Sequence, residues 1–191
     1  MSRLLIVGLV LSIAGCTVAD KQPALHDFGR SGVSLTRQGN VSINVNAPTW
    51  LWDNRIRYRL LFASPSEIRF YGLDRWIASP PELFEQSLTS SGKLPDYSLL
   101  IRLQDFEQQF DAPAKAHVVL RFSVEVFMSS DKRKIAEKEF YLERPTQTPD
   151  ALGTINGFTA LANQAAEEIS IWLLGLASQP FPLPAELKFK K

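Results

Sequence analysis

Few side chains in this sequence have the types and spacing needed for acid–base or nucleophilic chemistry. The two histidines are His26 and His117; a pairing of His117 with a serine stays open, although no G-x-S-x-G motif is present. We interpret the neighbouring acids Asp105, Glu107 and Asp111 as a solvated strand edge, not as a paired acid and base. The sequence also has no H-E-x-x-H motif and no glycine-rich phosphate loop. We therefore expect no enzyme, no metal site and no cofactor.

The only cysteine has surroundings that indicate one specific reaction. Cys16 follows Ile-Ala-Gly, and a basic start at Arg3 and an apolar stretch over 4–13 precede it. This is typical of a lipobox, where residues 1–15 are removed and the cysteine receives a diacylglycerol and an N-acyl chain. As a helix the stretch is about 15 Å long, too short for a bilayer core of about 30 Å. The alternative is an ordinary signal peptide cut elsewhere, with Cys16 incidental.

Composition limits what the mature chain can do. Removal of residues 1–15 takes away one basic residue, Arg3, and leaves 20 basic and 20 acidic side chains. This balance gives no reason to expect a nucleic-acid partner. With Cys16 acylated, no thiol remains for a disulfide, so the core alone must hold the fold, and 45% of the residues are hydrophobic. Thr17, where an aspartate would favour inner-membrane retention, indicates the outer membrane, facing the periplasm.

Hydrophobic alternation predicts most of the strands. It is clearest over 41–45, 55–62, 97–103 and 116–128, where apolar residues recur at every second position. Short strands are expected over 25–28 and 68–71, and a more charged one over 134–143. After Leu103 the apolar phase moves to Phe106, Gln108 and Phe110, which predicts a β-bulge near Asp105. The three strands from 97 to 143 should form an antiparallel meander.

Two helices are predicted from their start signals and periodicity. Ser79-Pro80-Pro81-Glu82 is a capping box, and the helix it opens should end at Gly92. Thr148-Pro149-Asp150 opens a second helix, whose apolar residues recur at spacings of three and four from Leu152 to Leu176. The order of elements predicts an α+β class: a single two-layer domain, with a mostly antiparallel sheet covered on one face by two helices. We assign the tether to 16–24, the domain to 25–179 and a proline-rich basic tail to 180–191.

Aromatic and arginine side chains are the candidates for binding a partner. Trp50 and Trp52 flank Leu51 in a loop, and Trp76 ends a later segment. They either plug the open end of the sheet or anchor an interface, as tryptophan often does in binding hot spots. Arg57 and Arg59, with Arg55 on the same strand face, are either solvated or bind carboxylates of a neighbouring subunit.

Several of these segments together resemble a known family. They are APTWL at 47–51, IRYRL at 56–60, YGLDRW at 71–76 and the prolines at 80–81. In these the chain resembles the ABC-type transport auxiliary lipoproteins, the family of paraquat-inducible protein C-like outer-membrane lipoproteins, over roughly residues 24–178. The resemblance implies a non-catalytic partner of an MCE-domain protein, which works with an ABC permease and ATPase in lipid transport. It also implies docking of that assembly at the outer membrane, with a homo-oligomeric ring left open.

Two other functions stay open from the sequence. One is a lipid-binding chaperone with a pocket between sheet and helices, where Phe122, Phe140 and Trp172 would line either a pocket or a packed core. The other is a lipoprotein that regulates an envelope-assembly machine. Co-purified lipid would favour the first, and a co-purified synthase or barrel protein the second.

Overall fold

The computed structural model describes residues 21–29, 42–88 and 97–178. The signal segment, Cys16, Gly92 and the tail at 180–191 lie outside these residues. The described elements are β1 (Ala24–His26), β2 (Ser42–Asn46), the 3-10 turn η1 (Thr49–Leu51), β3 (Arg55–Leu60), β4 (Ser64–Trp76), α1 (Pro80–Leu88), β5 (Tyr97–Ala112), β6 (Lys115–Met128), β7 (Lys134–Pro145) and α2 (Ala151–Ala177).

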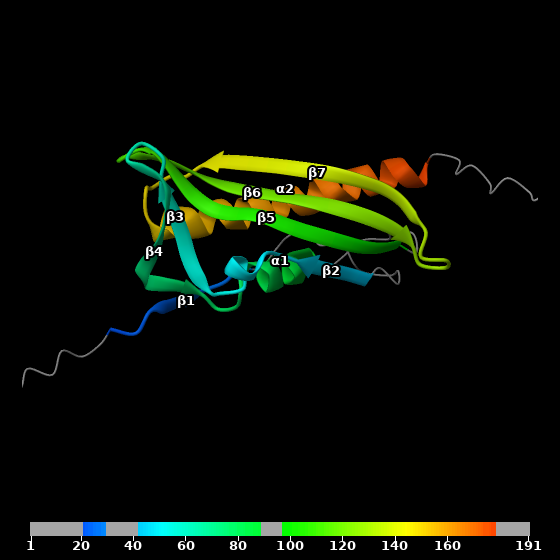
Figure 1. Ribbon diagram of the computed structural model, residues 1–191, viewed down its shortest axis with the longest axis horizontal. Helices are drawn as coiled ribbons and strands as arrows, with labels where there is room; N and C mark the ends of the chain where they lie inside the picture. Colours follow the sequence, from blue (N-terminus) through cyan, green and yellow to red (C-terminus); the bar gives the residue numbers. More distant parts are fainter. Residues whose placement is uncertain (1–20, 30–41, 89–96, 179–191) are drawn as a thin grey trace, which may run out of the picture.

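The strands form one seven-stranded sheet in the order β1-β4-β3-β5-β6-β7, with β2 also beside β5 (Figure 1). The pairs β3–β4, β5–β6 and β6–β7 are antiparallel, and β1–β4, β2–β5 and β3–β5 are parallel. The α+β class is confirmed, and so is the meander of β5, β6 and β7. The sequence did not indicate the three parallel pairings.

The predicted bulge in β5 is confirmed. Leu103 lies opposite Phe122 and Asp105 lies opposite Arg121, so Gln104 is one residue extra. Because side chains alternate in direction along a strand, the extra residue reverses the phase. Phe106 therefore faces the same buried side as Leu103.

Both helices begin at the residues that the caps predict. The Glu82 carboxylate accepts hydrogen bonds from the Ser79 N–H at 2.9 Å and from the Ser79 hydroxyl at 2.5 Å. Asp150 accepts from the Gly153 N–H at 2.8 Å and caps α2. Each carboxylate satisfies a donor at its helix start and favours the positive end of the helix dipole.

Aromatic contacts fill the space between the sheet and α2. The rings of Phe106 and Phe158 stack with centroids 3.7 Å apart, and those of Phe122 and Phe140 stack at 4.9 Å. Trp172 meets the Phe140 ring edge-on at 5.9 Å. Phe122 and Phe140 thus belong to a packed core. Leu152, which the periodicity placed on the apolar face of α2, is instead exposed in the first turn.

Two glycines of α2 give a matched test of how tightly the helix packs on the sheet. A Cβ at Gly157 would lie 2.7 Å from Val118 Cγ2 in β6, whereas a Cβ at Gly175 would meet nothing within 4 Å. We expect Gly157→Ala to lower the free energy of unfolding by about 1–3 kcal/mol through overpacking. Gly175→Ala should raise it by about 0.5–1 kcal/mol through helix propensity. Urea denaturation measures both, and equal effects of the two substitutions would contradict this packing.

Candidate functional site

Trp50 and Trp52 are held on the surface by the residue between them. Leu51 is buried in the core, and its N–H donates to the Pro48 carbonyl at 2.9 Å. Trp50 is 60% exposed and Trp52 is 45% exposed. The Trp52 indole N–H donates to the Ala47 carbonyl at 3.1 Å, which fixes its ring. We call residues 47–52 the Trp loop; it presents two aromatic side chains from an anchored position.

Two grooves border the Trp loop. The first, of about 290 Å³, is lined by Val45, Trp52, Pro81, Glu82, Glu85 and Gln86. The second, of about 340 Å³, is lined by Asn46, Ala47, Pro48, Leu100, Arg102, Leu103 and Gln104. In the first groove Glu85 accepts from the Val45 N–H at 2.9 Å, which ties α1 to β2. Exposed aromatic rings beside acidic and apolar surface suit a protein partner better than a small substrate.

Trp76 does not share this surface, contrary to the prediction that grouped it with Trp50 and Trp52. Its side chain is 1% exposed, and its ring meets Phe28, Phe106 and Phe158 edge-on. The cause is its place at the inward end of β4, opposite His26. Trp76 is a core residue. Of the three tryptophans, it alone fits the interpretation that they plug the open end of the sheet.

The interpretation of Arg57 as a solvated side chain is also corrected. Its side chain is only 4% exposed, and one guanidinium nitrogen donates to Asp53 at 3.0 Å. Arg55 donates to the same carboxylate at 2.8 Å and lies 3.7 Å above the Phe70 ring. Within the described residues the buried Nε of Arg57 has no hydrogen-bond partner. Arg57 therefore supports the base of the Trp loop from the open face of the sheet.

The carboxyl group of Asp53 titrates far below its ordinary range. Burial raises its pKa, but hydrogen bonds from Arg55 and Arg57 outweigh burial and lower the pKa to about 2. Asp53 is ionised at neutral pH, and its charge neutralises the buried Arg57.

Arg59 uses its guanidinium within the chain. It donates to both oxygens of Glu107 in β5, at 2.8 and 3.0 Å, and to the Pro65 carbonyl at 2.9 Å. The Glu107 pair raises the pKa of Arg59. A forked pair of this kind leaves Arg59 poorly placed to bind a carboxylate of another subunit.

The acids that the sequence groups together likewise each have a basic partner. Asp105 accepts from Arg121 at 2.6 Å, and the Asp111 carboxylate lies 3.5 Å from His117 Nδ1. Glu107 is buried, so the solvated-edge interpretation is wrong for it. Within the described residues no group of three or more His, Cys, Asp and Glu side chains is placed to hold a metal ion. No helix in the described part of the chain is long and apolar enough to span a membrane.

Comparison with known proteins finds solved structures that share this fold. No family model matches the chain, and no curated protein matches it by sequence. A crystal structure of a DUF330 protein from Xanthomonas campestris matches with a TM-score of 0.68 and 19% identity, over 82% of this chain and 98% of that one. A crystal structure of an uncharacterised protein matches with a TM-score of 0.59 and 13% identity, over 79% and 98%. A proposed lipoprotein from Caulobacter crescentus matches at only 0.40 and 15% identity, over 52% and 81%, and carries no argument. The chain shares the fold of the DUF330 protein.

The Asp53 pair generates a prediction about stability and pH. Asp53→Asn should lower the free energy of unfolding at pH 7 by about 1–2 kcal/mol. This is less than the loss of a fully buried pair, because Asp53 is 35% exposed and solvent screens it. Since its folded pKa of about 2 lies below the ordinary 3.8, the stabilisation is present above 3.8 and is lost as pH falls through about 2.

Urea denaturation from pH 7 down to pH 2 measures the difference between wild type and variant. Glu67→Gln, which removes the partner of the exposed Arg69, is the matched control and should change stability little. A difference for Asp53→Asn that stays constant over the whole pH range would contradict the assigned pKa.

Proposed function

We propose that this chain is a non-catalytic lipoprotein, anchored in the outer membrane through Cys16 and facing the periplasm. There it serves as the auxiliary component of an ABC/MCE-type lipid transport system and docks the periplasmic MCE assembly. The observation that carries the docking role is the exposure of Trp50 and Trp52 on a loop that the buried Leu51 fixes. The shared fold with a DUF330 protein and the resemblance at 47–51, 56–60 and 71–76 support the family.

The division of labour follows from what the chain offers. Docking uses the Trp loop, while transport energy comes from the ABC ATPase and permease of the inner membrane. Aromatic anchors that are already ordered lose little conformational entropy on binding, which favours them as the centre of an interface. Arg57 acts from behind the loop through Asp53, and Arg59 ties β3 to β5. Neither arginine is proposed to touch the partner.

The lipid anchor can be tested directly. Cys16→Ser should remove both lipidation and cleavage after Gly15, because the modified thiol is the substrate of the processing reactions. Intact mass spectrometry and membrane fractionation measure this. Ser12→Ala, in the apolar stretch, is the control and should leave both unchanged. A Cys16→Ser protein that still carries lipid and sediments with outer membranes would refute the anchor.

The docking role is tested by crosslinking the tagged, lipidated protein in native membranes and identifying its partners by mass spectrometry. We expect wild type to recover an MCE protein with its ABC subunits. Trp50→Ala with Trp52→Ala should reduce that recovery by about tenfold or more, as expected for hot-spot tryptophans. Ile171→Ala with Leu174→Ala, on the exposed face of α2, is the matched control.

Three results would decide against the proposal. Recovery of a cell-wall enzyme or a barrel protein without any MCE component would assign the chain to envelope assembly instead. Recovery of bound lipid without an MCE component would favour a chaperone, although the stacked rings of Phe122 and Phe140 fill the space it would need. Equal recovery by the tryptophan and control variants would move the docking surface away from the Trp loop.

A further inference from the structure

An apolar patch lies on the strand edge where the described chain begins. Leu25 in β1 is 60% exposed, Leu73 in β4 is 52% exposed, and Ile77 just after β4 is 60% exposed. We call these three residues the edge patch. Nothing in the docking role uses them, and a set of exposed apolar side chains on one surface marks a site of contact with a protein or a membrane.

Strand pairing brings the three side chains together. Leu25 lies opposite Arg75, and the Ile77 N–H donates to the His26 carbonyl at 2.8 Å, which continues the same register. Leu73, Arg75 and Ile77 alternate with the inward Trp76, so they share the face opposite to it. At the sheet edge, Leu25 and Ile77 also line one pocket of about 420 Å³, which Ile155, Asn156 and Thr159 of α2 border as well.

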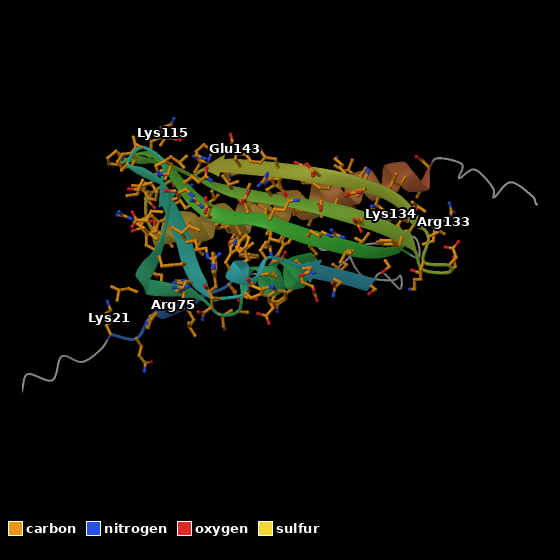
Figure 2. The ribbon with its side chains drawn as sticks, viewed as in Figure 1. Lys21, Arg75, Lys115, Arg133, Lys134 and Glu143 are labelled. Atoms are coloured by element: carbon orange, nitrogen blue, oxygen red, sulfur yellow. The ribbon has the colours of Figure 1, made fainter. Side chains whose placement is uncertain are left out.

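Positive charge flanks the patch. Figure 2 shows Lys21 and Arg75 at the end of the molecule that holds β1, while Arg133 and Lys134 lie at the opposite end. Two described acids lie beside the patch in sequence, and each is held by a hydrogen bond. Asp74 accepts from His26 at 2.8 Å, and Asp27 accepts from the Gly29 N–H at 2.7 Å. Apolar side chains beside cationic ones that form no ion pair within the described residues match a phospholipid surface, where headgroup phosphates lie next to the acyl region.

The short tether favours the membrane as the surface that the edge patch contacts. Four residues lie between Cys16 and Lys21, so even a fully extended tether spans at most about 18 Å from one to the other. The 27-residue helix α2 is about 40 Å long, so the tether is far shorter than the domain. A lipid on Cys16 therefore keeps the β1 end beside the bilayer at high effective concentration, whatever direction the rest of the domain takes.

From these observations we propose that the edge patch rests on the membrane that holds the anchor, with Leu25, Leu73 and Ile77 entering the interface and Lys21 and Arg75 meeting lipid phosphates. This rests on the proposed anchoring at Cys16 but not on the MCE partner. It gives the domain a defined orientation on the bilayer, where a tether alone would leave it free to tumble.

The chain offers a clean way to test this surface. The lipid consumes the thiol of Cys16, the only cysteine, so an introduced cysteine is the single labelling site. The mature, lipidated protein is prepared with Leu25→Cys or Ile77→Cys, labelled with an environment-sensitive fluorophore, and reconstituted into phosphatidylethanolamine–phosphatidylglycerol vesicles. Ile171→Cys, equally exposed on the outer face of α2, is the matched control.

We expect blue-shifted emission at positions 25 and 77, and quenching by lipids that carry a spin label on the acyl chain, with neither effect at 171. Labels at 25 and 77 that behave like the label at 171 would overturn the proposal and leave a protein as the occupant. Intact mass spectrometry distinguishes failure of the edge-patch proposal from failure of the lipid anchor. A lipidated protein with unquenched labels refutes the edge patch alone, whereas a protein without lipid on Cys16 refutes the anchor and the edge patch together.

Discussion

β5 pairs with β6 along nearly its whole length, but its other edge is divided between two strands. β2 occupies the first half, from Ser98 to Arg102, and β3 occupies the second half, from Gln108 to Phe110. The division falls at the bulge around Gln104. Without that extra residue, the apolar side chains of one half would point away from α2, and the sheet could not bury both halves on one face. The aromatic stack of Phe106 on Phe158 depends on it directly.

The Trp loop is a consequence of the same division. Residues 47–52 connect the strand on one half of β5 to the strand on the other half, so the loop must cross the sheet edge beside the bulge. One of its two grooves is lined by Leu103 and Gln104 themselves. The loop crosses as a 3-10 turn with Leu51 inward, and this leaves the tryptophans on either side exposed. A feature of the core thus determines where the two exposed tryptophans lie.

The sequence predicted the features that are set by residues close together in the chain. The phase change after Leu103 predicted the bulge, and the side chains of Glu82 and Asp150 predicted both helix starts. The parallel pairings depend on contacts between distant segments, so the alternation within a single strand could not predict them. The strand β4 is longer than predicted. Gly72 interrupts its hydrophobic pattern, so a strand was predicted only over 68–71.

The candidate site shows the same limit at the level of single residues. From the sequence, Trp50, Trp52 and Trp76 were equal candidates for binding a partner. Trp76 is nevertheless buried, because β1 pairs beside it. Arg57 was expected either in solvent or against a carboxylate of a neighbouring subunit, because it alternates with Ile56. Its side chain instead donates to Asp53 of the same chain. Burial of a charge requires a partner, and that partner is visible only in the folded chain.

The edge patch and the Trp loop are joined through very few residues. The Trp76 N–H donates at 2.8 Å to the carbonyl of Asn54, two residues after Trp52, and Arg55 lies opposite Arg75 in the sheet. The strand β4, which carries two residues of the edge patch at and just beyond its end, is therefore hydrogen-bonded to the base of the Trp loop. Figure 1 shows β4 beside β3. Within one continuous sheet such a connection is stiff, because several backbone hydrogen bonds would have to break for either part to turn independently. If the edge patch rests on the bilayer, the direction in which Trp50 and Trp52 face the periplasm is set by strand geometry and not by the tether.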